Sequence, residues 1–317
     1  MAKKDGEATT VYYPIQYPFS VDRDADLRDP KQPSGRFGRL VNMIVYGQVL
    51  KTRYGISELV HTADTSDVVS TNDFSGDANC ISWYKLDTYS GNIAADSQGS
   101  NPMTGISTGN SAYLTQDFTN TIAPGLTASL SLDNSPTNNS AFVTCPIGSQ
   151  GTAMPGQVGE NTTLSFCGWL RWSGTTQLNS RGIFGRWDAS SAARSFLLYA
   201  FSTANTIRFL VRDTGGSNAD IDTGIALVSE KWYHVKGTFD SATNTSTLRV
   251  CNSSGTTIYT GNDTIPNGME TINQALTLGA FNADETRAWD GNLQEWVLFK
   301  DIVTDSEQDD IIAGTYS

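Results

Sequence analysis

Side chains that could perform catalysis are few in this chain of 317 residues. Its two histidines, His61 and His234, form no His-Glu-x-x-His zinc motif. Glycine-rich loops that cradle phosphate are also absent from the sequence. His234 lies in an apolar strand pattern with no nucleophile beside it, which favours a structural hydrogen-bonding role. The sequence therefore predicts a protein that is not an enzyme.

The four cysteines, Cys80, Cys145, Cys167 and Cys251, lie far apart, and no Cys-x-x-Cys pair occurs. They allow three disulfide pairings, among which the sequence does not choose. Cys167 and Cys251 fall inside apolar strand patterns, so we expect small buried thiols. Neither histidine has ligand spacing with a cysteine, which argues against zinc.

Two tryptophans that precede aspartates could bind sugar. Sugar rings stack on exposed aromatic faces, while carboxylates bind hydroxyl groups. Trp187 and Asp188 end a predicted loop that begins at Gly185, and Trp289 and Asp290 lie beside polar turns. These four residues are the candidate glycan-binding residues. A position in the core or at its rim stays open for both tryptophans.

Charge and composition exclude several classes of protein. A net charge of −12 and a pI near 4.5 would repel phosphate backbones, so nucleic acid is not an expected partner. The densest apolar run, Phe196–Phe201, is far shorter than the roughly 20 residues of a membrane span. No apolar stretch follows Lys3 and Lys4, so we expect no secretory signal and synthesis in the cytoplasm of the producing cell. Charged residues are only 17%, and the many Ser, Thr, Asn and Gly residues favour an all-β protein with polar turns.

From about Asn79 onward, short apolar runs alternate with polar turn clusters, as is typical of β-strands. Within one run, period-two alternation puts His234, Lys236 and Thr238 outside, opposite the apolar side chains. A helix follows the last run, with a capping box at Thr304–Glu307. The expected strands are 81–86, 128–132, 141–144, 163–172, 195–201, 206–211, 232–239, 246–251, 257–259, 275–278 and 292–299. Strands at this spacing predict a two-sheet antiparallel sandwich.

The first 70 residues differ from the rest. Prolines are interspersed among the aromatic side chains of Tyr12, Tyr13, Tyr17 and Phe19, and they favour an extended path. Two apolar runs, 39–46 and 49–54, flank Gly47-Gln48, which predicts a β-hairpin with a two-residue turn. We expect residues 1–70 to form an anchoring arm with a hairpin, and residues 71–317 to form the sandwich. Packing of the extension on its own domain is the alternative.

Several segments together resemble a laminin-G-like domain of the concanavalin A-like lectin/glucanase superfamily. The strongest similarity is in Lys231–Asp240. The other segments run in family order over about residues 79–313: Trp83–Asp87, Ser129–Asp133, Leu164–Trp169, Leu276–Gly279 and Trp289–Trp296. The resemblance implies a jelly-roll of two curved antiparallel sheets, with Trp83, Trp169, Trp232 and Trp296 at core positions.

The same resemblance bears on catalysis and metal binding. Glucanases of this superfamily carry a Glu-x-Asp-x-(x)-Glu strand, whose carboxylates act as nucleophile and acid. Of the eight glutamates here, only Glu307 has Asp two residues later, and no second glutamate completes the motif. Calcium is the implied candidate cofactor, with Asp87 and Asp96 as ligands. Gln294, where the family usually has Asp, weakens such a site, and turn stabilisation is the alternative role.

Laminin-G-like modules usually act outside cells, whereas no export signal is expected here. Virion components are assembled in a host cytoplasm and then face the environment. We therefore expect a non-enzymatic bacteriophage virion protein, a structural protein of the tail fibre or a capsid decoration. Its arm would bind other virion proteins, and its sandwich, displayed as a homo-oligomer on the particle surface, could bind host-surface glycans. A secreted glycan-binding or adhesion protein of a cell, and a glycosidase with an unrecognised motif, are the alternatives.

Overall fold

The computed structural model divides the chain into two compact units, Met1–Val68 and Val69–Ser317. In the described residues, both units consist almost entirely of β-strands, as the composition predicts. The structure describes residues 9–11, 48–53, 56–61, 70–86, 89–90, 93–99, 101–108, 114–117, 123–126, 129–132, 140–151, 154–160, 162–174, 180–188, 193–281 and 287–317.

The N-terminal unit contains a three-stranded antiparallel sheet in the order β1 (Thr9–Val11), β2 (Gln48–Arg53) and β3 (Ile56–His61). A hairpin is present, but the predicted turn at Gly47-Gln48 is wrong, because Gln48 already belongs to β2 and pairs with His61. Two residues, Tyr54-Gly55, separate β2 from β3, which is also the length of a tight hairpin turn. The sequence pattern alone could therefore not choose between a turn at Gly47-Gln48 and one at Tyr54-Gly55. β1 pairs with the other edge of β2, and residues 39–46 lie outside the described residues.

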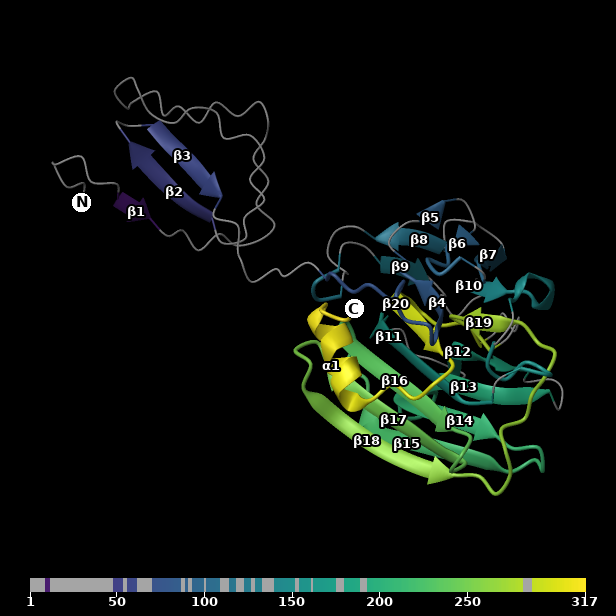
Figure 1. Ribbon diagram of the computed structural model, residues 1–317. Helices are drawn as coiled ribbons and strands as arrows, with labels where there is room; N and C mark the ends of the chain where they lie inside the picture. Colours follow the sequence, from purple (N-terminus) through teal and green to yellow (C-terminus); the bar gives the residue numbers. More distant parts are fainter. Residues whose placement is uncertain are drawn as a thin grey trace. The chain divides into compact units, whose positions relative to one another are not determined.

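The second unit consists of two antiparallel sheets that face each other (Figure 1). The first sheet contains, in spatial order, β15 (Asn218–Ala226), β14 (Thr206–Arg212), β13 (Arg194–Phe201), β12 (Arg181–Trp187), β19 (Leu276–Leu278), β10 (Ser140–Cys145), β7 (Met103–Thr108), β6 (Ile93–Ala94) and β5 (Tyr89–Ser90). The second contains β18 (Thr257–Thr264), β17 (Thr245–Asn252), β16 (Trp232–Asp240), β11 (Leu164–Trp172), β20 (Gly291–Phe299), β9 (Ser129–Leu132) and β8 (Leu114–Asp117), with β4 (Cys80–Tyr84) paired to β20. A short 3₁₀ turn, η2 (Ile147–Ser149), follows β10, and the helix α1 (Asp305–Ala313) follows β20. This arrangement confirms the predicted two-sheet sandwich.

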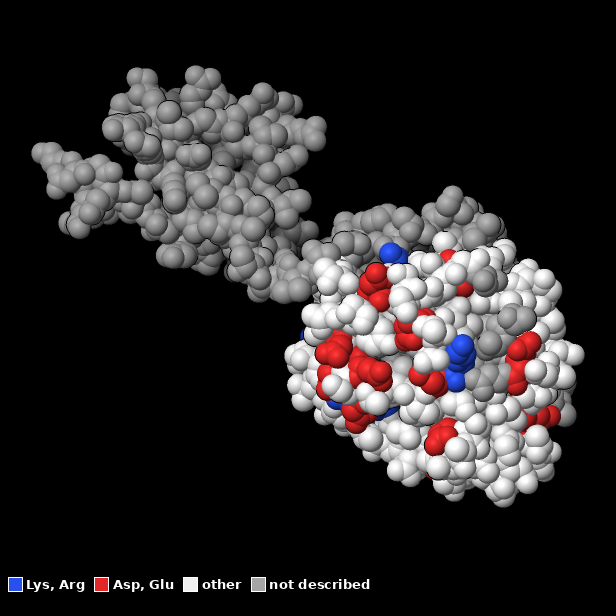
Figure 2. Space-filling view, viewed as in Figure 1, with Lys and Arg blue, Asp and Glu red and all other residues white. Residues whose placement is uncertain are grey.

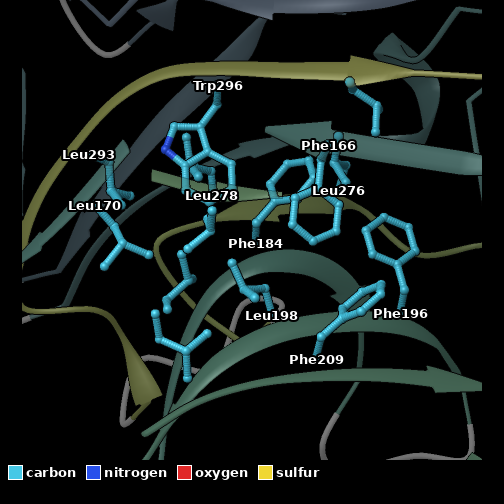
Figure 3. Close-up of a cluster of buried hydrophobic side chains, with 14 of the residues drawn as sticks. Phe166, Leu170, Phe184, Phe196, Leu198, Phe209, Leu276, Leu278, Leu293 and Trp296 are labelled. Atoms are coloured by element: carbon cyan, nitrogen blue, oxygen red, sulfur yellow. The ribbon is translucent and has the colours of Figure 1, made fainter. Parts of the chain in front are cut away.

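Aromatic side chains from both sheets meet between them (Figure 3). The ring centroid of Phe166, from β11 of the second sheet, lies 5.2 Å from Phe184 and 5.3 Å from Phe209, both of the first sheet. Trp296 of β20 lies 5.3 Å from Phe184. All four side chains are buried, so they form the centre of the core that joins the sheets.

Two glycines of the second sheet make room for these rings. A Cβ atom at Gly237 would lie 2.2 Å from the ring of Phe166, and one at Gly168 would lie 2.4 Å from the ring of Trp296. The indole Nε1 of Trp296 donates a hydrogen bond of 3.1 Å to the carbonyl of Trp169. The two large rings are therefore held at sites where the neighbouring strand has no side chain.

The helix α1 covers the outer face of the second sheet (Figure 1). The predicted capping box is confirmed: Thr304 and Glu307 satisfy each other's backbone N–H groups, and Gly314 ends the helix with a φ of 72°. From β16, the Lys236 ammonium donates to the Asp305 carboxylate at 2.6 Å. Arg249 of β17 also bonds the helix, so charged groups fasten α1 to the sheet.

This covered face corrects the expected exposure of β16. His234, Lys236 and Thr238 do lie opposite the apolar residues of the strand, as predicted, but all three are buried. The sequence alternation gives the face on which a side chain lies, and it does not tell whether a helix covers that face.

His234 is the most enclosed of the three. Gln308 accepts a hydrogen bond from Arg249 through Oε1, so its Nε2 donates to Nδ1 of His234, at 3.1 Å. The neutral imidazole then carries its proton on Nε2. Its ring packs edge-on against Trp169, with 4.9 Å between centroids. Burial, together with the charges of Arg249 and Lys236, lowers the pKa of His234 to about 3, which supports a structural role.

The beginning and the end of the sandwich are bound to each other. Backbone N–H groups of Thr71 and Asp73 donate to the carbonyls of Gly314 and Tyr316, both at 2.8 Å. Phe74 is completely buried and stacks on Tyr316, with 4.8 Å between ring centroids. Residues 70–74 are thus part of the folded sandwich.

Trp232 provides a test of the covered face. Its side chain is 8% exposed and packs with Trp169, Ala123 and Ile312. Replacement by alanine should lower the free energy of unfolding by about 3–5 kcal/mol, because a buried aromatic side chain leaves a cavity. Denaturant unfolding followed by circular dichroism measures the change. The control Lys231→Ala, at an exposed neighbour, should change the free energy of unfolding by less than about 0.5 kcal/mol. If both variants lose the same stability, Trp232 is not a buried side chain of the covered face.

The buried His234 predicts a pH effect on stability. In the unfolded chain this histidine titrates near 6.5, whereas in the folded sandwich it titrates at about 3. Between these values only the unfolded state binds the proton, so His234 lowers stability as pH falls, by about 1.4 kcal/mol per pH unit. His234→Asn keeps an acceptor near Nδ1 and removes the titration. The variant should gain stability relative to the wild type as pH falls from about 6.5 to about 3. Parallel pH profiles of the two proteins would refute this.

Candidate functional site

Three neighbouring strands of the first sheet, β13, β14 and β15, bear charged and aromatic side chains on their outer surface. Phe196 and Phe209 point into the core, so the residues that alternate with them point outward. The pairing register places Tyr199 opposite Arg208, and Arg208 opposite Asp222. We name this surface the arginine face; it consists of Tyr199, Phe201, Arg208, Leu210, Asp220 and Asp222.

Arg208 organises the arginine face. Its guanidinium carbon lies 4.1 Å from the ring centroid of Phe201, a cation–π contact. Its Nε and Nη2 atoms lie 2.9 Å and 2.7 Å from Oδ2 of Asp222, and its Nη1 lies 3.4 Å from Oδ2 of Asp220. One cation therefore contacts a ring and two carboxylates, and the Arg208 side chain keeps 23% of its surface exposed.

The two carboxylates differ in their electrostatics. Burial acts to raise the pKa of Asp222, but hydrogen bonds from the Gly224 backbone and Arg208, together with the charge of Arg208, outweigh it, and the pKa is lowered. Burial raises the pKa of Asp220, and although Arg208 opposes the shift, the charges of Asp222 and Asp263 add to it. Asp222 is thus the fixed ionic partner of Arg208. Asp220 is the looser one, with 42% of its side chain exposed.

An aromatic cluster adjoins the arginine face. Trp187, Leu197, Tyr199 and Phe281 pack together, with Phe201 and Leu210 against them. Tyr199 meets Phe281 edge to face, at 5.7 Å between centroids. Arginines lie over two of these rings, Arg194 over Trp187 at 5.4 Å and Arg287 over Phe281 at 5.2 Å. The rings of Trp187, Tyr199 and Phe281 are buried, so the partly exposed apolar side chains beside the hydrogen-bonding groups are Phe201 and Leu210.

The two tryptophans that are candidates for glycan binding lie in different parts of the sandwich. Trp187 ends strand β12 and is not in a loop; it belongs to the aromatic cluster but is only 6% exposed. Asp188 follows it and is half-buried. Trp289 is completely buried in the main core, and Asp290 accepts a hydrogen bond from Ser173 at 2.7 Å. Trp289 therefore takes the core position that the sequence left open, because its ring packs between the sheets.

The anchoring residues Tyr12, Tyr13, Tyr17 and Phe19 lie outside the described residues, and so does Asp87. Their predicted roles are therefore not tested by the structure.

Asp96 does not fit the implied calcium site. Its Oδ1 accepts hydrogen bonds from the backbone N–H groups of Trp83 and Gln98, and its Oδ2 accepts one from Asn101. Gln294, at the usual carboxylate position, bonds the N–H of Ala123 at 2.9 Å. No group of three His, Cys, Asp or Glu residues that could hold a metal occurs in the part of the chain that is described. Asp96 thus acts as a turn-stabilising residue.

One serine has the spacing of a hydrolase nucleophile, in the sequence Gly105-Ile106-Ser107-Thr108-Gly109. In hydrolases this motif forms a sharp turn between a strand and a helix. Here residues 105–108 belong to strand β7, where Ser107 pairs with Ala141 of β10. The motif lacks its structural context, so it assigns no nucleophile.

All four cysteines are free thiols, and three of them are buried, as the strand patterns predict. Burial raises the pKa of Cys145 to about 11 and that of Cys167 to about 12. These thiols stay protonated at physiological pH and are poor nucleophiles.

The sequence analysis missed most of the arginine face. Two signals were present: the run Phe196–Phe201 is apolar on both faces of its strand, and Asp220 and Asp222 have the period-two spacing of one strand face. On its inward face β15 has only Ala219 and Ile221 before Thr223, so its apolar alternation is too short to identify a strand. Among the described residues, no helix is both long and apolar enough to cross a membrane.

Comparisons with solved structures support the fold. One match is domain 4 of AbnA, a GH43 extracellular arabinanase from Geobacillus stearothermophilus, solved in complex with arabinotriose. It has a TM-score of 0.51 and 15% identity, and covers 74% of this chain and 98% of that chain. Another is the binding domain of botulinum neurotoxin serotype D/C, with a TM-score of 0.50, 14% identity and coverage of 75% and 52%. At these identities, the likeness shows the fold alone.

Sequence comparisons add the family. No curated protein matches the chain significantly. A family profile described as the concanavalin A-like lectin/glucanases superfamily, of laminin-G type, matches residues 147–307, just over half of the chain. The matched segment runs from η2 to α1 and includes every strand of the arginine face. The chain belongs to the concanavalin A-like lectin/glucanase superfamily.

Proposed function

We propose that the protein is a non-enzymatic glycan-binding protein whose sandwich binds sugar through the arginine face. The observation that carries the proposal is the contact of Arg208 with the Phe201 ring and with two carboxylates on a partly exposed sheet face. A sugar ring could pack on the apolar side chains, while Arg208 donates and Asp220 accepts hydrogen bonds. The lectin-like fold, shared with a domain solved with arabinotriose, supports this proposal.

The electrostatics of the arginine face favour binding over catalysis. A glycosidase needs one carboxyl group as acid and a second as base or nucleophile. Asp220 and Asp222 are the pair on this face that could be compared with such a site. Both contact the same guanidinium, and Asp222 is occupied as its ion-pair partner. We therefore propose that the pair orients Arg208 for ligand binding.

Glycan binding can be measured on an array and then by calorimetry, with arabinotriose among the first ligands. Arg208→Gln should weaken binding at least about tenfold, since it removes a charged donor. It should lower the free energy of unfolding by less than about 1 kcal/mol, because the ion pair is partly exposed.

Lys231→Ala, an exposed cation outside the arginine face, is the matched control and should bind like the wild type. An array on which no glycan is bound would refute the proposed function. Sugar turnover that is lost in Asp220→Asn would refute its non-enzymatic part.

We propose further that this sandwich is displayed on a bacteriophage virion, as part of a tail fibre or as a capsid decoration. The N-terminal unit before the sandwich offers a separate element for attachment to other virion proteins. Four free thiols agree with assembly in a reducing cytoplasm. Repeated copies on a particle would raise avidity for weakly bound host glycans. A secreted adhesion protein of a cell is the alternative.

Deletion of residues 1–65 tests the attachment. The sandwich should still fold, because its strands all lie after residue 69, and so do the hydrogen bonds between residues 71–73 and the C-terminal segment. The truncated chain should be missing from purified particles that contain the full-length protein, since the anchoring segment is gone. Quantitative mass spectrometry of particles measures this. Incorporation of the truncated chain at full copy number would show that the sandwich itself attaches.

A further inference from the structure

The net negative charge of the chain belongs to one of its two units. Residues 1–68 contain nine basic and nine acidic residues, so the net charge of −12 arises entirely from residues 69–317. On the side of the sandwich that bears α1, acidic side chains gather over the helix (Figure 2). Any ligand of the sandwich therefore approaches a negatively charged body.

The arginine face contains one cation and two carboxylates, so it carries the same sign as the rest of the sandwich, while Arg194 and Arg287 lie over rings of the adjoining aromatic cluster. Arg208 is balanced by Asp222, and Asp220 adds a second negative charge beside it. Asp263, from β18 of the other sheet, adds a third: its Oδ2 accepts a hydrogen bond of 3.0 Å from the backbone N–H of Asp220. The next arginine on β14, Arg212, forms its own ion pair with Glu270. Both arginines of β14 therefore form ion pairs with carboxylates.

Asp220 is the polar group best placed to meet a ligand. Its carboxylate has one side-chain contact among the described residues, the 3.4 Å approach of Arg208, and is 42% exposed. A carboxylate with spare lone pairs accepts hydrogen bonds from hydroxyl groups. It repels carboxylate and sulfate groups at the same distance. The acceptor role favours a neutral sugar that is rich in hydroxyl groups. The repulsion disfavours an acidic sugar.

We propose that the arginine face selects uncharged glycans and excludes those with carboxylate or sulfate groups, with Asp220 as the acceptor of a sugar hydroxyl. This inference rests on the proposed function and adds the class of ligand. Arg208 serves here as a donor whose charge is already neutralised by Asp222, so it does not recruit anions.

The test compares matched ligands on an array that prints neutral oligosaccharides beside their sialylated and sulfated forms. For each glycan bound, the anionic form should bind at least about tenfold more weakly, because like charges are brought together. The difference should grow at low ionic strength, where screening is weaker.

Three variants assign the effect to the arginine face. Asp220→Asn should weaken binding of the neutral form about tenfold, because a neutral acceptor replaces a charged one. Asp222→Asn leaves Arg208 with only the 3.4 Å contact to Asp220 and should therefore reduce the exclusion of the anionic forms. Asp310→Asn removes the same charge from exposed α1 and should change neither.

The outcomes separate this inference from the proposed function. If the anionic forms bind as well as the neutral ones, the protein is a glycan-binding protein, but the inference is overturned. If Asp310→Asn relieves the exclusion as much as Asp222→Asn, the selection comes from the charge of the whole sandwich, and the role of the arginine face is overturned. If neither form binds to the wild type or to any variant, the proposed function fails, and this inference fails with it.

Discussion

The aromatic contact between the two sheets is the interaction on which the rest of the structure depends. Phe166 can lie flat against its own sheet because Gly237 has no side chain there, and it reaches Phe184 and Phe209 across the core. Successive side chains of a strand point to opposite faces of the sheet, so the neighbours of the inward-facing Phe196 and Phe209 point outward. Tyr199 and Arg208 must face outward. The position of the candidate site is therefore a consequence of how the core packs.

The outer faces of the two sheets serve different purposes. On the second sheet, charged residues are buried beneath α1, where Arg249 and Lys236 bond the helix. Removing one partner from such a site would leave a buried charge without compensation, so this face is structural. On the first sheet, Arg208 and its carboxylates stay partly exposed. The same residue types thus hold the fold together on one side and stay partly exposed on the other.

Local patterns in the sequence predicted most of the long strands of the sandwich, whereas β5 to β8, β12 and β15 were not predicted. All eleven predicted strands overlap strands of the structure, and the capping box marked α1, because these features depend on neighbouring residues. β15 was missed because it is an edge strand with exposed polar residues, and Trp187 was placed in a loop because Gly185 suggested a turn. The burial of Trp289 and the cover over His234 come from distant segments, which no local pattern reports. The arginine face likewise needs the register of three strands.

The clasp between residues 70–74 and the C-terminal segment has a mechanical consequence. A force applied through the N-terminal unit enters the sandwich at Ser70, whose N–H bonds the carbonyl of Gly125, and then meets the bonds to Gly314 and Tyr316. Phe74 must also leave its buried site before the force reaches β4. The load is therefore first shared between two segments, the one at Gly125 and the C-terminal one at Gly314 and Tyr316. Force that enters at Ser70 would therefore have to break these contacts before it reaches the core that positions the arginine face.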